Sequence, residues 1–343
     1  MKAIIIRSFK GPHGLTFEDK PDPELRDGTV LIDVKASGVN FADLMMTQGL
    51  YRDAPPLPFT PGYEVAGTVE KVGRGVTDIN PGDRVIAATY FQGYATKVAA
   101  DATKTFPLPS RLSFSQGAAI LVNYFTAWVA LHEMARLKSG DTVLIHGAAG
   151  GVGIASMQLA KISGATIIGT AGSEEKRQFL LGYGASRAIN YRTEDFVQAC
   201  LDVTKGRGVD VILDPIGGDS ISKDFTALAP NGRVVAFGIA QMVSGKTRSL
   251  FKVLTTYLKM RTINLIDLMN GNKGIFGLNA LRLWNEVEMM SGAFRKISEF
   301  IDRDQLSPII AKEFPLADAP HAMQFLLDRK NIGKVILTNT REA

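Results

Sequence analysis

The chain has 343 residues, of which 45% are hydrophobic, so it is long and apolar enough to form two ordinary domains with buried cores. The formal net charge of +5 is spread along the sequence without blocks of like charge, which argues against a nucleic-acid-binding surface. The single cysteine, Cys200, excludes an internal disulfide, and no apolar run approaches the roughly 18 residues that a membrane-spanning helix needs, which argues against an integral membrane protein.

Up to about residue 120, the sequence consists of short segments of alternating polarity separated by glycine and proline. It predicts strands at residues 30–34, 67–72 and 84–87. This pattern is typical of a mostly antiparallel β domain. Residues 1–7 also predict a short strand, not a cleavable signal region, so we expect the protein to be cytoplasmic.

From residue 122 the pattern changes to strands alternating with helices, which is typical of a doubly wound parallel sheet. The predicted strands lie at residues 142–145, 166–170, 188–190, 209–214, 233–237 and 262–266. After an amphipathic stretch at 281–301, a helix and a strand at 335–337 follow, and we assign them to the first domain. The expected fold is α/β, with a discontinuous β-rich domain (1–121 and 302–343) and a Rossmann domain (122–301).

A glycine-rich turn joins the strand at 142–145 to the helix after it. Gly147 allows a sharp bend, while Gly150 and Gly151 let backbone amides approach a pyrophosphate without an intervening Cβ atom. Val152 and Gly153 then open the helix, whose unpaired N-terminal amides can bind phosphate. The spacing is GxxGxxG, and its place between a strand and a helix predicts a dinucleotide-binding site; the alternative is a turn without a ligand.

The strand at 166–170 is followed by Ser173, where an NAD-binding unit usually has an acidic residue for the ribose hydroxyls. Ser173 can bond to a 2′-phosphate, Lys176 can neutralise it, and Tyr191 and Arg192 supply a phenol and a second cation. The two glutamates after Ser173 are interpreted as partners of the helix dipole. NADPH is therefore the predicted cofactor in preference to NADH.

Several motifs together resemble the medium-chain dehydrogenase/reductase superfamily over nearly the whole chain. They are GVNFAD at 38–43, PGYEVAG at 61–67, PGDRV at 81–85 and the glycine turn. Within the superfamily the chain looks like the zinc-free quinone oxidoreductases, and DPIGG at 214–218 and KNIGKV at 330–335 bring it nearest to the vesicle amine transport protein homologues. The resemblance implies a GroES-like catalytic domain built from both chain ends, an NADPH domain, a cleft joining the two, and a homodimer through an edge strand, which we place at 233–237.

The resemblance also implies most of the residues that bind the cofactor. The predicted set is Asn40, Thr126, Gly147, Gly150, Gly151, Val152, Ser173, Lys176, Tyr191, Arg192, Phe237, Gly238, Phe276, Arg329 and Asn331. The alignment is looser at Arg329. Phe276 is also a candidate for the wall of an apolar cleft that takes a flat substrate, although aromatic residues more often belong to the core.

Zinc-dependent relatives carry cysteine and histidine where this chain has Asn40 and Tyr63, and they add a lobe with four cysteines that has no counterpart here. The residue types agree, because one cysteine and four histidines without a helical i,i+4 pair do not supply an ordinary metal site. We therefore expect no metal. Without a Lewis acid the acceptor should already be electrophilic, as quinones and α,β-unsaturated carbonyls are.

Asn40 and Tyr51 are the candidate catalytic residues. The Asn40 amide can hold the nicotinamide ribose or the substrate oxygen, and the Tyr51 phenol can orient the carbonyl or relay a proton. Asn40 could equally be a turn residue after a strand, and Tyr51 a packed aromatic. We expect Tyr63 to pack in place of the lost histidine, and Asp43 and Glu64 to fix backbone or ion-pair geometry.

The predicted function is a zinc-independent, NADPH-dependent quinone oxidoreductase, a homodimer that transfers hydride to a small apolar quinone or conjugated carbonyl. Two alternatives stay open: a reductase of enones or 2-alkenals, and an NADPH-binding, membrane-associated protein with little turnover. Residues 246–261 bear on the last, because they mix apolar and basic side chains. They could lie on an anionic membrane, although we favour a helix that packs on its own domain.

Overall fold

The computed structural model describes residues 1–243, 249–259 and 264–339. The chain divides into two compact units. Unit 1 contains the described residues of 1–125 and 281–339, and unit 2 contains those of 126–243 and 249–280. Unit 1 is therefore built from two separate stretches of chain.

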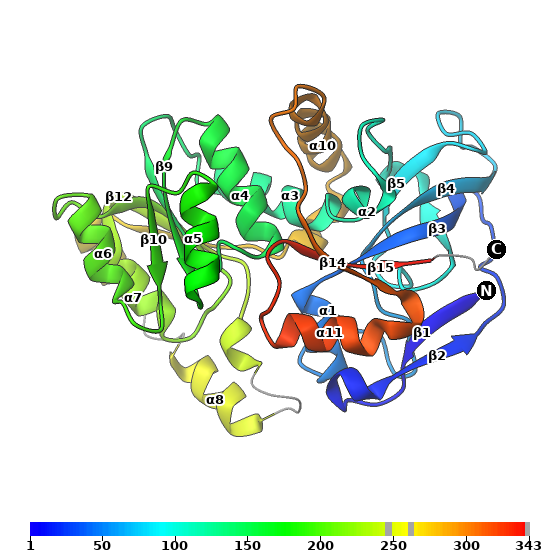
Figure 1. Cartoon of the computed structure of the whole chain (residues 1–343), viewed down its shortest axis with the longest axis horizontal. Helices are drawn as coiled ribbons and strands as arrows, with labels where there is room; N and C mark the ends of the chain where they lie inside the picture. The colour runs from blue at the N-terminus through cyan, green and yellow to red at the C-terminus, as the bar shows by residue number, and fades with distance from the viewer. Residues whose placement is uncertain (244–248, 260–263, 340–343) are drawn as a thin grey trace. The chain divides into compact units, whose positions relative to one another are not determined.

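Unit 1 is β-rich and is organised around one large sheet (Figure 1). Its strands are β1 (Lys2–Ile6), β2 (Leu15–Asp19), β3 (Thr29–Val39), β4 (Glu64–Val72), β5 (Arg84–Ala88), β6 (Lys97–Asp101), β7 (Thr105–Pro107), β14 (Ile310–Pro315) and β15 (Lys334–Thr338). The seven-stranded sheet has the order β14-β15-β3-β4-β5-β7, with β6 also paired to β3, and β1 and β2 form a hairpin. The pairing of β15 with β3 is antiparallel and sets Val335 opposite Val39. Lys334 and Asn40 are therefore neighbours, although they are far apart in the sequence.

Alternation along β3 and β4 accounts for the core of this sheet. Val30, Ile32 and Val34 of β3 are buried together with Val65 and Val69 of β4. Successive side chains of a strand point to opposite faces, so residues spaced by two share one face. This is the period of two from which the antiparallel β domain was predicted, and the fold class is confirmed.

Seven short helices and the longer α10 complete unit 1 among the described residues. They are η1 (Gly11–Gly14), α1 (Phe41–Thr47), η2 (Ala102–Lys104), α2 (Phe114–Gly117), η6 (Ala280–Asn285), α10 (Val287–Asp302), η7 (Leu316–Asp318) and α11 (Ala319–Leu327). Helix α3 (Leu121–Trp128) carries the chain from unit 1 to unit 2.

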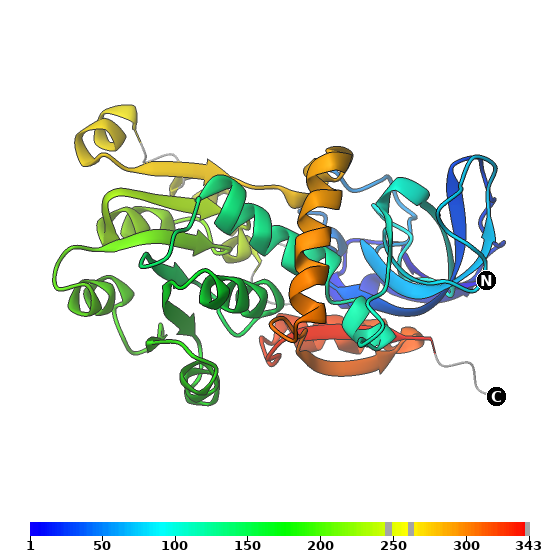
Figure 2. The same ribbon diagram turned by 90° about the horizontal axis from the view of Figure 1, so that it is seen from above.

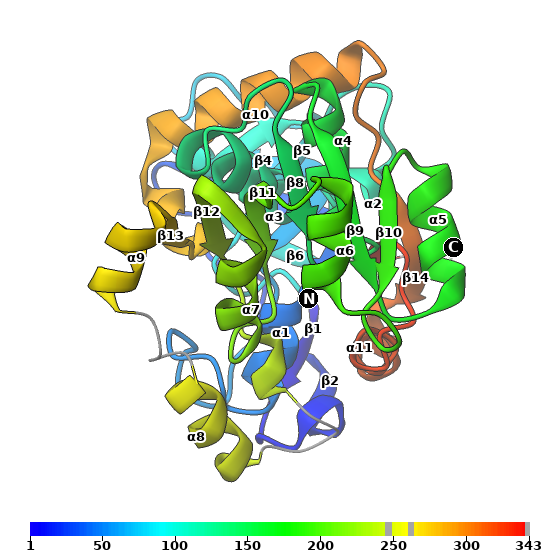
Figure 3. The same cartoon turned by 90° about the vertical axis from the view of Figure 1, so that its left-hand side faces the viewer.

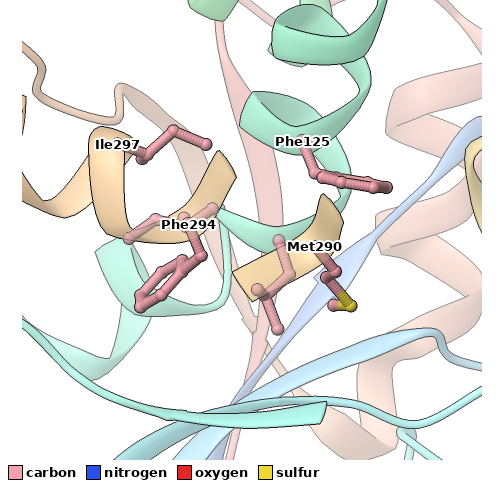
Figure 4. Close-up of a pocket in the computed structure, with 6 residues that line it drawn as sticks. Phe125, Met290, Phe294 and Ile297 are labelled. Atoms are coloured by element: carbon pink, nitrogen blue, oxygen red, sulfur yellow. The ribbon is translucent and has the colours of Figure 1, made fainter. Parts of the chain in front are cut away.

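Helix α10, the long orange helix in Figure 2, belongs to unit 1, whereas the predicted boundary at residue 301 assigned it to the Rossmann domain. Its side chains Met290, Phe294 and Ile297 line a small apolar pocket with Phe125 of α3 (Figure 4). Phe294 also packs on Phe106, with ring centroids 4.5 Å apart. The amphipathic pattern predicts the helix, but it does not say which domain covers the apolar face.

Unit 2 holds a six-stranded sheet whose described pairings are all parallel (Figure 3). Its strands are β8 (Thr142–Ile145), β9 (Thr166–Ala171), β10 (Arg187–Asn190), β11 (Val209–Asp214), β12 (Leu228–Ala236) and β13 (Gly274–Gly277). The order is β10-β9-β8-β11-β12-β13, so the direction of winding reverses between β8 and β11. Ligands of such sheets bind outside the carboxyl ends of the strands, at the reversal point.

The helices of unit 2 follow the strands in the expected alternation. They are η3, a π-helical segment (Val129–Met134), α4 (Gly151–Ile162), α5 (Glu174–Gly182), α6 (Phe196–Val203), α7 (Ser220–Ala227), η4 (Ala240–Met242), α8 (Leu250–Lys259) and α9 (Leu265–Gly271). Right-handed crossovers place α4 and α5 on one face of the sheet and α6 and α7 on the other. The doubly wound sheet predicted from the sequence is confirmed.

The sixth strand of this sheet was predicted in the wrong place. Residues 264–266 of the predicted strand begin helix α9, while residues 262 and 263 lie outside the described residues. Asn264 caps α9, because its side chain accepts a hydrogen bond of 2.9 Å from the backbone N–H of Asp267. The true sixth strand is β13, a four-residue segment with glycine at each end.

The predicted edge strand also needs correction. Residues 233–236 lie in β12, which pairs with β11 on one side and with β13 on the other. The edges of the described sheet are β10 and β13, and β13 is the edge next to β12. A contact between copies through this edge would use residues 274–277 in place of 233–237.

Two apolar segments bear on membrane contact. The stretch Phe114–Met134, which contains α2, α3 and η3, is long and apolar enough to cross a membrane by length and composition, contrary to our sequence-based expectation, but 72% of its most apolar window is buried. Helix α8 exposes Phe251, Leu254, Tyr257 and Leu258, so these side chains do not pack inward as we favoured. The basic residues at 246, 248 and 261 lie outside the described residues.

Candidate functional site

The glycine turn after β8 has the geometry of a phosphate-binding turn. Gly147 has a φ of +61°, in the left-handed region that favours glycine. A Cβ atom on Gly153 would lie 2.5 Å from the carbonyl oxygen of Ala148, so only glycine lets α4 pack this closely on the turn. Gly150 is the N-cap of α4, and the next two residues open the helix. The free N-terminal amides of a twelve-residue helix therefore lie at the carboxyl edge of the sheet.

Three of the four residues predicted to bind a 2′-phosphate, Ser173, Lys176 and Tyr191, lie near the end of β9. Ser173 is the N-cap of α5, and its Oγ accepts a hydrogen bond of 3.3 Å from the backbone N–H of Lys176. The hydroxyl of Tyr191 lies against Gly172, where any side chain would collide with it. Because Gly172 has no side chain, the Tyr191 hydroxyl can lie against the backbone directly before Ser173.

Glu174, the first acidic residue after Ser173, is bonded to residues of its own helix. Both carboxylate oxygens of Glu174 accept hydrogen bonds of 2.7 Å from Arg177, and Gln178 donates a third at 2.7 Å. The bonds from Arg177 and Gln178 lower the pKa of Glu174 to about 2. Glu174 is therefore an ionised partner of its own helix, in agreement with its interpretation as a dipole partner.

Two further predicted cofactor residues follow β12. The backbone N–H of Phe237 donates a hydrogen bond of 2.9 Å to the carbonyl of Asp214, where β11 ends. A Cβ atom on Gly238 would lie 2.6 Å from the carbonyl oxygen of Pro215, so the two loops pack tightly backbone to backbone. Both residues lie at the same carboxyl edge as the glycine turn.

The other predicted cofactor residues of unit 2 are less closely grouped. Arg192 follows Tyr191 directly and is exposed. Phe276 lies in the edge strand β13 and is 40% exposed, which does not agree with a place in the core. Thr126 is buried in α3.

Asn40 lies in a buried polar cluster of unit 1. We call this group, which consists of Asn40, Glu64, Asn123 and Lys334, the lysine cluster; none of its members is more than 7% exposed. The ammonium of Lys334 donates to Asn40 Oδ1 at 2.6 Å, to Asn123 Oδ1 at 3.4 Å and to Glu64 Oε1. Three oxygen atoms therefore surround one cation.

Both oxygen atoms of the Glu64 carboxylate accept hydrogen bonds. Its Oε1 also accepts a hydrogen bond of 3.3 Å from Asn40 Nδ2, and its Oε2 accepts one of 2.9 Å from the backbone N–H of Val122. Gly38 makes room for the pair, since a Cβ atom there would lie 2.5 Å from Glu64 Oε1 and 2.8 Å from Lys334 Cε. These are the ion-pair and backbone contacts that we expected of Glu64.

Asp43 adds a second buried acid next to Asn40. Its Oδ2 accepts hydrogen bonds from the backbone N–H of Asn40 at 2.8 Å and from the Tyr94 hydroxyl at 2.7 Å. Its Oδ1 has no partner among the described residues. Burial raises the pKa of Asp43 to about 6, against the opposing effects of the Tyr94 and Asn40 hydrogen bonds. The side chain fixes the start of α1 by binding the N-cap residue.

Tyr51 contacts an aromatic group in unit 1. Its ring centroid lies 6.1 Å from that of Tyr63, which also packs on Phe91 at 5.4 Å and Trp284 at 6.1 Å. Tyr63 is buried, and burial together with the neighbouring Tyr51 raises its pKa. Tyr63 therefore has the packing role that we expected, and Tyr51 lies at the half-buried margin of the group.

The last two predicted cofactor residues follow α11. Arg329 is exposed and has a φ of +56°, while Asn331 is buried and donates a hydrogen bond of 2.9 Å from Nδ2 to the carbonyl of Gly333. Only two residues separate Asn331 from Lys334 of the lysine cluster, which opens β15.

A buried pair lies beneath the glycine turn. His146 Nε2 is 2.9 Å from Asp224 Oδ1, and its Nδ1 is 3.2 Å from the hydroxyl of Thr170. That hydroxyl also accepts a hydrogen bond of 3.2 Å from the N–H of Gly147. Burial alone would lower the pKa of His146, but the charge of Asp224 and its hydrogen bond outweigh burial and raise it. The pair helps to hold the first residue of the turn.

The described residues contain no cluster of three or more histidine, cysteine, aspartate or glutamate side chains arranged to hold a metal. Residues 26–129 match the alcohol dehydrogenase GroES-like domain, and residues 151–280 match the family described as zinc-binding dehydrogenase. The human synaptic vesicle membrane protein VAT-1 homolog is 34% identical over 340 residues, which cover 98% of this chain and 86% of the relative. The chain belongs to the medium-chain dehydrogenase/reductase superfamily.

Within this superfamily the chain belongs to the quinone oxidoreductase branch, near the VAT-1 homologues. The rat quinone oxidoreductase is 34% identical over 340 residues, covering 98% of this chain and 97% of the relative. The structure of Escherichia coli quinone oxidoreductase complexed with NADPH is similar with a TM-score of 0.87 and 30% identity, and the alignment covers 99% of this chain and 100% of that one. The protein is therefore an oxidoreductase of the medium-chain dehydrogenase/reductase type.

Two members of the lysine cluster in this medium-chain dehydrogenase/reductase were missed from the sequence. Lys334 counted only as part of a family motif, and Asn123 was not considered. Each carried a signal: Lys334 is followed by three apolar strand residues, and Asn123 is a lone polar residue in the apolar run 120–125. A polar residue inside an apolar run needs a buried partner, and here the partners are each other.

Proposed function

We propose that this protein is a zinc-independent, NADPH-dependent quinone oxidoreductase. The observation that carries the choice of cofactor is the meeting of Ser173, Lys176 and Tyr191 at the end of β9, while Glu174 is bonded to Arg177. A serine, a lysine and a phenol suit a 2′-phosphate, whereas an NAD site usually has a carboxylate for the ribose hydroxyls. The NADPH complex of the Escherichia coli relative supports the same choice.

The residues present fit a dinucleotide. The positive φ of Gly147 and the close packing at Gly153 leave the N-terminal amides of α4 available for a pyrophosphate. Lys176 would neutralise the 2′-phosphate, and Ser173 and Tyr191 would bond to its oxygens. When bound, NADPH supplies the hydride that reduces the acceptor.

The lysine cluster supports a reaction without zinc. Asn40, Glu64 and Asn123 already direct oxygen atoms at the ammonium of Lys334, so the negative charge of Glu64 is neutralised from within the chain. A metal ion at these oxygens would have to displace a buried cation or lie beside it, which like charges disfavour. An acceptor that is electrophilic through conjugation, such as a quinone, needs hydrogen-bond donors for its developing oxyanion, and Asn40 is the leading candidate.

The test is a screen of NADPH oxidation with ortho-quinones, para-quinones and 2-alkenals, using the wild type and Asn40→Ala. We expect turnover of quinones, and a fall of roughly a hundredfold in kcat for Asn40→Ala with a smaller change in the Kd of NADPH. Asn285→Ala is the matched control, since Asn285 is also in unit 1 and accepts a hydrogen bond from a lysine, Lys104, at 3.2 Å. Full activity of Asn40→Ala on every acceptor would refute the proposal, and turnover of alkenals alone would replace it with the enone reductase.

We also propose that the protein acts in the cytoplasm as a homodimer joined at β13. The support is that β13 is one of the two edges of the described parallel sheet, where backbone groups can pair with a second copy, and that it adjoins β12.

A further inference from the structure

We propose that Lys334 is a positioning residue that makes Asn40 and Asn123 act only as hydrogen-bond donors toward a ligand. It does so by binding both amide oxygens inside the protein, which leaves the amide N–H groups for an acceptor oxygen. Asn123 then becomes a second donor for the carbonyl oxygen of the substrate or of the nicotinamide carboxamide. This inference rests on the proposed function and deepens it.

The charge of Lys334 decides how the two amides are turned. An ammonium has three N–H donors and no acceptor, so the amide atom that faces it must be oxygen, not nitrogen. Asn40 Oδ1 lies 2.6 Å and Asn123 Oδ1 3.4 Å from the same Nζ atom. The third donor goes to Glu64 Oε1, and all three are therefore used. Lys334 has no donor to spare for a ligand, and it acts through the amides.

The donors that remain are weakly held. Asn40 Nδ2 donates to the carbonyl of Gly38 at 3.2 Å and to Glu64 Oε1 at 3.3 Å, both longer than the usual N–H···O distance of about 2.9–3.0 Å. Asn123 is only 5% exposed, and the contact of its Oδ1 with Lys334 turns its Nδ2 away from the ammonium. Long hydrogen bonds such as those of Asn40 Nδ2 cost little to exchange for a bond to a ligand oxygen.

The arrangement suits an oxygen that gains negative charge. Fixed N–H dipoles stabilise such an oxygen without reorganising during the reaction, whereas a freely turning amide would present its carbonyl half of the time and repel it. The ion pair with Glu64 keeps the positive charge of Lys334 neutralised, so turning the amides does not leave an uncompensated buried charge.

The first test replaces a donor and keeps the contact to the lysine. In Asn123→Asp one oxygen can still face Lys334, but the NH2 group becomes an acceptor of the same size. We expect kcat for quinone reduction to fall at least about tenfold with the Kd of NADPH close to that of the wild type. The Tm should fall, because a second carboxylate is buried in the cluster that contains Glu64. Asn285→Asp makes the same change next to Lys104, and should leave kcat unaltered. A kcat for Asn123→Asp within twofold of the wild type would overturn the donor role.

The second test removes the positioning group without leaving a buried charge. Lys334→Met combined with Glu64→Gln takes away both members of the ion pair, and Lys97→Met with Glu70→Gln does the same to a pair in the same sheet whose atoms are 3.0 Å apart. In protein labelled with ¹⁵N-asparagine, the side-chain NH2 signals of Asn40 and Asn123 are identified by their loss in Asn40→Ala and Asn123→Asp. We expect both signals to shift in the first double variant and neither in the second. Unshifted signals in the first would show that Lys334 does not position the amides.

The two readouts separate this inference from the proposed function. If none of the tested quinones and alkenals supports NADPH oxidation by the wild type, the proposed function is refuted. The NMR signals still decide whether Lys334 orients the amides. Conversely, quinone turnover with unshifted signals leaves the function standing and removes the inference.

Discussion

Ionisation of the buried Asp43 lowers the stability of the folded state of unit 1. Its pKa is about 3.8 as an ordinary carboxyl group and is raised to about 6 by burial. Between these values the folded protein binds a proton that the unfolded chain releases, so the contribution of this group to stability is present below pH 4 and is lost as the pH rises through 6.

We predict that Asp43→Asn removes this dependence. The amide oxygen of the new asparagine can take the place of Asp43 Oδ2 and accept the hydrogen bonds from Asn40 and Tyr94, while no carboxylate has to ionise. The free energy of unfolding of the variant, relative to that of the wild type, should therefore rise by about 3 kcal/mol between pH 4 and pH 7. Urea denaturation at four pH values measures the difference, and a constant difference would contradict the prediction.

The choice between NADPH and NADH also belongs to single residues. We predict that Lys176→Glu inverts the preference for NADPH over NADH. The Kd of NADPH should rise about tenfold to a hundredfold, because a carboxylate would face the 2′-phosphate. The ratio of the two dissociation constants, measured by fluorescence titration, checks this. Lys161→Glu makes the same charge change on the exposed end of α4 and serves as the control. An unaltered ratio in Lys176→Glu would remove the assignment of this lysine.

At the scale of elements, sequence reasoning succeeded where one local signal dominates. Helix α4 was predicted correctly because its glycines have a steric cause within the same turn, and β8 and β11 because they are apolar runs between turn residues. It failed at β13 and α9. Leu265 and Ile266 have the composition of a strand, but the cap formed by Asn264 and Asp267 makes them the start of a helix. β13 is too short and too rich in glycine to show a period.

The packing of α4 on its turn gives a prediction for this element. Gly153→Ala would place a Cβ atom 2.5 Å from the carbonyl oxygen of Ala148, so the helix has to shift. We expect a loss of about 1–3 kcal/mol in stability and weaker NADPH binding, because the N-terminal amides shift with the helix. Gly182→Ala is the control, since a Cβ atom there meets no atom within 4 Å. Thermal unfolding and NADPH titration measure both variants, and equal behaviour of the two would contradict the steric argument.

At the scale of the whole molecule, the limit on prediction is long-range pairing. The glycine turn and the phosphate site are local, and the sequence shows them. The lysine cluster joins Asn40 and Lys334, which are 294 positions apart and meet only because β15 pairs with β3. Such a contact follows from the topology of the sheet, and no spacing in the chain encodes it. For the same reason the edge strand was misplaced, since the edge depends on which strand comes last in the sheet.

The corrected edge leads to a prediction for the oligomer. If two copies pair through β13, Gly277→Glu should separate them, because a charged side chain on a short edge strand opposes pairing with a second strand. The change is tolerable within one copy, since a Cβ atom on Gly277 meets no described atom within 4 Å. We expect light scattering to give the mass of two chains for the wild type and of one chain for the variant, at similar Tm. Gly182→Glu adds the same charge on α5, away from β13 in the order of the sheet, and should keep the mass of two chains. A wild type with the mass of one chain, or a Gly277→Glu variant that stays paired, would exclude β13 as the contact between copies.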